Sequence, residues 1–182
     1  MEQPEVPTEH LHEHMEHHAK HGGERWTLGV ALSSALLAAL AAVASLQAGH
    51  HANEAMVSQI ESANQWSYFQ SKSIKEGQLK TKMDLLVALD KPAAETDHAK
   101  AEEYKQDKEK IQVAAGAKER EAHHHLTTHQ IFAKSVTMFQ IAISVGAFSV
   151  LTKRPKFWYV SLILGILGVA FFIQAFWSAA GH

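Results

Sequence analysis

Histidines are the residues of this chain best suited to bind a metal ion or a proton, because the sequence holds 14 of them and no cysteine. One group lies in the stretch EHLHEHMEHHAKH near the N-terminus. In a helix, spacings of four, three and four residues align four imidazoles on one face: His10, His14, His17 and His21. Imidazoles so spaced can share zinc, nickel or copper. The other interpretation, which we favour, is an amphipathic segment lying along a membrane surface.

A second group of histidines is divided between residues 50–54 and residues 123–129. If the chain between them forms a helical hairpin that turns near Lys91 and Pro92, the two stretches come level with each other. Four side chains then give three nitrogens and one oxygen for a divalent transition metal: His51, Glu54, His125 and His129. The alternative is a polar collar of histidines at a membrane boundary.

Other kinds of site lack their usual signatures. The sequence has no glycine-rich phosphate loop, no HExxH or GxSxG motif and no paired carboxylates in an apolar setting. We therefore expect no enzymatic activity. The formal net charge is −2 and no basic stretch is interleaved with aromatic residues, which argues against nucleic acid as a partner.

Three apolar blocks must position these side chains: residues 26–46, 131–151 and 157–177. Each is long enough to cross a hydrocarbon core of ~30 Å as a helix. The blocks contain no Asp or Glu, and Lys134 is their only basic residue. The sequence therefore predicts an all-α membrane protein with three transmembrane helices. Small residues recur every four positions in each block, which suits either packing within the chain or association between copies.

A basic loop, residues 152–156, joins the second and third blocks and predicts the orientation, because short basic loops stay cytoplasmic. We expect a bacterial inner-membrane protein with the following order along the chain: 1–25 His-rich cytoplasmic segment, 26–46 first span, 47–130 periplasmic helical hairpin, 131–151 second span, 152–156 cytoplasmic loop, 157–177 third span and 178–182 short periplasmic tail.

The expected hairpin arms carry thin, coiled-coil-like apolar stripes. On the returning arm the heptad positions are Ala94, Ala101, Lys108, Ala115, Ala122 and His129, with Tyr104, Ile111, Lys118, His125 and Phe132. On the outgoing arm we expect the stripe Met56, Ile60, Ala63, Ser67, Ile74 and Leu85. So little apolar surface stabilises an isolated hairpin poorly, since burial yields only ~25 cal/mol per Å². Association between copies would offset the deficit.

The chain resembles the bacterial membrane protein family called domain of unknown function 4337. The resemblance lies in PTEHLHEHMEHHA, RWTLGVALSSALLAALAAVASLQAGHHANEAM, QIESANQWSYFQSKSIK, VTMFQIAISVGAF and FWYVSLILGILG, and covers nearly the whole chain. It implies an integral membrane protein and brings no activity. It also draws attention to Trp66, Tyr68 and Phe69, which suit a partner-binding surface. The alternative is that Trp66 and Phe69 pack against the returning arm near residues 113–118.

Two functions follow as expectations. The first is a structural or interaction protein, a homo-oligomer in contact with membrane lipids that displays its hairpin to itself or to a periplasmic protein. The second is a metal- or proton-responsive ion channel or sensor that uses the histidines at the membrane boundary.

Overall fold

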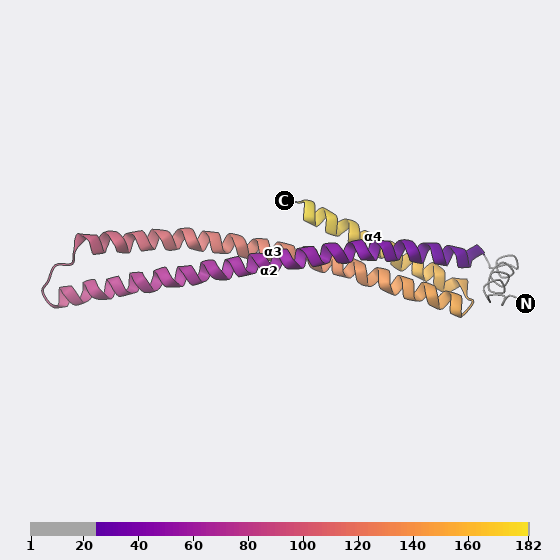
Figure 1. The fold of residues 1–182 in the computed structure, drawn as a ribbon, viewed down its shortest axis with the longest axis horizontal. Helices are drawn as coiled ribbons and strands as arrows, with labels where there is room; N and C mark the ends of the chain where they lie inside the picture. The colour runs from indigo at the N-terminus through magenta and orange to yellow at the C-terminus, as the bar shows by residue number, and fades with distance from the viewer. Residues whose placement is uncertain (1–24, 182) are drawn as a thin grey trace, which may run out of the picture. The chain divides into compact units, whose positions relative to one another are not determined.

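The computed structural model describes residues 25–181, and this part of the chain is helical. It contains α2 (Arg25–Ala88), α3 (Glu95–Leu151) and α4 (Pro155–Ala180), joined by short turns (Figure 1). Each of the three helices includes a segment long and apolar enough to cross a membrane. The prediction of an all-helical chain with three such helices is confirmed.

Contacts divide the described chain into two units. The three-helix unit comprises the chain as far as Leu46 together with Ile131–Gly181, and the paired-helix unit comprises Gln47–Gln130. The boundaries fall inside α2 and α3, so each of these helices contributes to both units.

Small residues bring the helices of the three-helix unit close together. A Cβ added to Gly168 on α4 would lie 2.6 Å from Cδ1 of Phe139 on α3, and one added to Gly165 would lie 3.1 Å from Leu37 of α2. The Ser161 hydroxyl donates a 2.6 Å hydrogen bond to the carbonyl of Ala142. Close backbone approach and serine hydrogen bonds are typical of helices that associate in lipid. The small residues of α3 and α4 are thus used within the chain.

The turns after α2 and α3 have the same construction. Asp90 and Lys153 both adopt left-handed backbone conformations, with φ of 54° and 53°. After α2, Lys91 N–H donates to the carbonyl of Leu86 and Asp90 N–H donates to that of Val87. The corresponding bonds close the end of α3. This pattern is the Schellman motif. In both turns a proline follows two residues after the left-handed position and prevents the helix from continuing.

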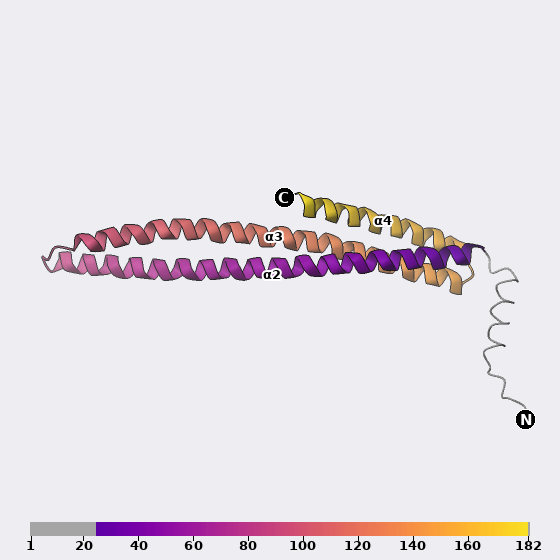
Figure 2. The same ribbon diagram turned by 45° about the horizontal axis from the view of Figure 1, so that its top comes forward.

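In the paired-helix unit, α2 and α3 run antiparallel and side by side (Figures 1 and 2). The buried residues of α2 recur at intervals of three or four: Ala48, His51, Ala55, Ser58 and Ser62. On α3, some of the predicted heptad positions are buried (Ile111, Ala115 and Ala122), whereas Ala94, just before the helix, is exposed. The Ser62 hydroxyl joins the two helices by donating to the carbonyl of Ala115 at 3.1 Å. Small and polar side chains therefore form most of this contact.

The predicted stripe on the outgoing arm was wrong. Met56, Ile60, Ile74 and Leu85 are all more than half exposed. The prediction selected the most apolar residues of the arm, whereas α2 turns its alanines and serines toward α3. Small side chains let the two backbones approach, and the Ser62 hydroxyl bonds the Ala115 carbonyl across the contact, so the larger apolar residues lie on the opposite face.

Candidate functional site

Two histidines from different helices meet in the paired-helix unit. His51 on α2 and His125 on α3 have their Nδ1 atoms 3.1 Å apart, and one of these nitrogens donates a hydrogen bond to the other. The ring centroids lie 5.4 Å apart. His51 is only 9% exposed, in a seam whose other buried members are mostly alanines and serines. The expectation that residues near 51 and 125 lie level with each other agrees with this contact.

Two more imidazoles flank the pair. The ring of His50 lies 5.4 Å from that of His51, and the ring of His124 lies 5.9 Å from that of His125. Burial lowers the pKa of His51, and the charges of His125, His50 and His124 lower it further, while Glu54 opposes the shift. His51 therefore takes up a proton less readily than an ordinary histidine does.

The other predicted ligands do not join the pair. His129 points its Nδ1 at the backbone carbonyl of Ala48, to which it donates at 2.8 Å. Across residues 25–181, no group of three or more His, Asp or Glu side chains is arranged to hold a metal ion. The set of His51, Glu54, His125 and His129 thus reduces to one pair in direct contact, and metal binding there stays a prediction. His10, His14, His17 and His21 lie outside the described residues.

The predicted interaction residues Trp66, Tyr68 and Phe69 all lie on α2, and two of them are in contact with each other. Trp66 and Phe69 meet edge to face, with their ring centroids 5.6 Å apart, and Tyr68 is half exposed. Lys108 of α3 lies 5.5 Å from the centre of the Phe69 ring. Phe69 therefore contacts α3 outside the predicted range of residues 113–118. Tyr68 lies beside Lys72, whose Nζ is 5.4 Å from the Tyr68 ring.

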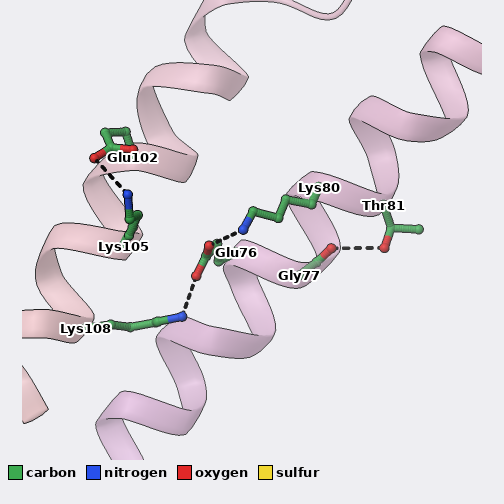
Figure 3. A network of polar contacts seen from close by, with 7 residues as sticks. All are labelled: Glu76, Gly77, Lys80, Thr81, Glu102, Lys105 and Lys108. Carbon is green, nitrogen blue, oxygen red and sulfur yellow. Dashed lines mark hydrogen bonds and ion pairs between the residues drawn. The ribbon is translucent and has the colours of Figure 1, made fainter.

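Ion pairs join α2 to α3 along the paired-helix unit. The Glu76 carboxylate accepts from Lys108 and from Lys80 at 2.6 Å each (Figure 3). The hydrogen bond from Lys108, followed by that from Lys80, holds the pKa of Glu76 below its usual value. Three further pairs link the helices: Lys72 with Asp107, Lys82 with Asp97 and Lys118 with Glu61.

These ion pairs were not among the features predicted from the sequence. A signal was present in the predicted heptad itself, where Lys108 and Lys118 interrupt the apolar positions. A lysine at a position that faces a partner helix calls for an acidic residue opposite it. Glu76 and Glu61 on α2 supply those acids.

The fold defines a class of protein: within residues 25–181 the chain is all-helical, with three helices long and apolar enough to span a membrane. Residues 26–178 match the family model described as Domain of unknown function (DUF4337), and the chain belongs to that family. The resemblance inferred from the sequence is thereby confirmed. No curated protein and no solved structure matches the chain.

Proposed function

We propose that this protein is a structural or interaction protein of the bacterial inner membrane, and that it acts as a homo-oligomer. In this proposal the paired-helix unit is a coiled-coil-like helical hairpin in the periplasm. The N-terminus and the basic loop of residues 152–156 are cytoplasmic, and the C-terminus is periplasmic. The role is non-catalytic and involves no nucleic acid.

The outward surface of the three-helix unit supports the membrane location. Large apolar side chains on α2 and α4 are mostly exposed: Leu28, Leu32, Leu36, Ile163 and Ile166. The helix contacts behind them are made largely by glycine, serine and alanine. Contiguous apolar surface of this kind is unfavourable in water, whereas lipid tails solvate it.

The observation that carries the oligomer is the outward face of α2 in the paired-helix unit. Met56, Val57, Ile60 and Ile74 are exposed by 62%, 51%, 55% and 61% on helix positions that do not face α3. The contact between α2 and α3 leaves them uncovered, because it uses mainly small and polar residues. The same face of a second copy would bury these four side chains. None of them is ionisable, so the contact would bring no like charges together.

The mass of the protein in lipid nanodiscs tests the proposal. The wild type is expected to carry two or more copies per particle, and a Met56→Glu, Ile60→Glu variant is expected to shift toward one copy. Val113→Glu provides the matched control, because Val113 is 70% exposed on α3. A strictly monomeric wild type would refute the oligomer.

We propose that the aromatic residues Trp66, Tyr68 and Phe69 of α2 bind a periplasmic protein partner. Aromatic residues are enriched among the side chains that dominate binding energies. Tyr68 is half exposed, and the Phe69 ring lies beside Lys108 of α3. A rigid aromatic surface supported from behind suits recognition of a protein.

The second function that we propose is a metal- or proton-responsive sensor or ion channel. The contact between His51 and His125 favours the sensor, because a change in the charge of this pair acts on the contact between α2 and α3. Reconstituted liposomes test the channel: ion flux equal to that of protein-free liposomes would exclude it.

A further inference from the structure

The two imidazoles that join α2 to α3 are close enough to share one metal ion. Zinc lies ~2.0–2.1 Å from each histidine nitrogen that binds it. With Nδ1 atoms 3.1 Å apart, an ion at that distance from both would subtend an angle of roughly 100°, between square-planar and tetrahedral values. The ion would replace the hydrogen bond between the rings and require little movement of the helices.

The surroundings hold the pair in place. Small buried residues lie within about one helical turn of each histidine: Ala48 and Ala55 near His51, and Ala122 near His125. These alanines keep the two helices close. A ligand pair positioned by its scaffold loses less entropy on binding an ion than a flexible pair does.

Two carboxylates near the pair also favour metal binding. Glu54 interacts with His51, and Glu121 interacts with His125, which places two carboxylates where they can offset the charge of an ion.

We propose that His51 and His125 form a two-histidine binding site for a divalent transition metal, zinc, nickel or copper, that clamps α2 to α3. The inference rests on the metal-responsive function proposed second above. No third His, Asp or Glu of residues 25–181 completes a ligand group, so water completes the coordination. An open site of this kind binds reversibly and responds to the concentration of the metal.

Zinc chloride alone is the probe, added to the full-length protein without an affinity tag. The background carries His10→Ala, His14→Ala, His17→Ala and His21→Ala, which remove the N-terminal imidazoles as competing ligands. Zinc is expected to raise the midpoint of thermal unfolding by several degrees. His51→Gln and His125→Gln should each abolish the rise, while His50→Ala and His124→Ala should retain it.

Circular dichroism without metal shows whether each variant is folded, so a lost zinc effect can be attributed to the lost ligand. A rise that survives both glutamine variants, or one that His124→Ala abolishes equally, means adventitious zinc binding and overturns the clamp. Acidification in the presence of EDTA tests the proposed metal- or proton-responsive function separately from the zinc clamp. If it changes helix pairing while zinc has no effect, the clamp is overturned and a proton-responsive function stands. If neither zinc nor acidification changes the pairing of the helices, both the clamp and the metal- or proton-responsive function are refuted.

Discussion

Glu76 on α2 and Lys108 on α3 are bonded at 2.6 Å across the paired helices, and only 5% of the glutamate is exposed. Lys80 occupies the second carboxylate oxygen, also at 2.6 Å. A buried carboxylate is unfavourable unless its oxygens are paired, and here both are. The contact therefore specifies which residues of the two helices lie opposite each other.

Replacing this carboxylate should weaken the helix pair. Glu76→Gln removes the charge and leaves one accepting oxygen for Lys108 and Lys80 together, so one lysine loses its acceptor and we expect a loss of ~1–2 kcal/mol in the free energy of unfolding. Chemical denaturation followed by circular dichroism measures it. Glu102→Gln is the matched control, since Glu102 is exposed and its lysine contact is 3.9 Å long. Equal effects in the two variants would contradict the structural role assigned to Glu76.

The same residue predicts a pH dependence. Hydrogen bonds from Lys108 and then Lys80 hold the pKa of Glu76 below its ordinary 4.5. A carboxyl whose pKa is lower in the folded state stabilises the fold fully above its unfolded pKa, and this contribution is lost as the pH falls through the folded pKa. Stability should therefore decline below about pH 4.5, and less steeply in Glu76→Gln. Identical slopes for the variant and the wild type between pH 5 and pH 2.5 would contradict the prediction.

Gly168 should tolerate no side chain. Its added Cβ would lie 2.6 Å from Cδ1 of Phe139, whose side chain is fully buried and cannot move aside easily. We expect Gly168→Ala to cost ~1–3 kcal/mol of stability through overpacking. Gly77→Ala is the control, because nothing lies within 4 Å of its added Cβ, and alanine favours a helix by ~1 kcal/mol. Thermal unfolding in detergent should thus move in opposite directions for the two variants.

The left-handed residues at the helix ends offer a stabilising change. Asp90 has φ of 54°, a conformation that costs roughly 1 kcal/mol in most residues and little in glycine. Its negative charge also lies at the C-terminal end of α2, where the helix dipole disfavours it. Asp90→Gly should therefore raise the unfolding midpoint. Lys91→Gly, one residue further, should give no gain, because Lys91 does not have a positive φ.

Much of the helical framework could be predicted because it depends on composition. Three apolar blocks predict three helices able to cross a bilayer, and the proline after Lys91 predicts the break between α2 and α3. The heptad of α3 was readable in part, since Ile111, Ala115 and Ala122 are buried, whereas Ala94 is exposed.

The partner face of α2 could not be read in the same way. Ser58 and Ser62 are nearly fully buried, whereas Met56 and Ile60 are exposed, so apolarity points to the wrong side of the helix. The ion pairs were missed for a related reason. Which lysine lies opposite which acid depends on the alignment of α2 with α3, and residue types alone do not specify that alignment.

Labelling of single cysteines in intact spheroplasts tests most directly the central claim that the bilayer separates the two turns of this chain. The natural sequence has no cysteine, so Lys91→Cys and Lys153→Cys each introduce one unique thiol. A membrane-impermeant maleimide should label Cys at position 91 before lysis and Cys at position 153 only after it. Labelling of position 153 alone in intact spheroplasts would contradict the proposed orientation, and labelling of both would contradict the separation itself.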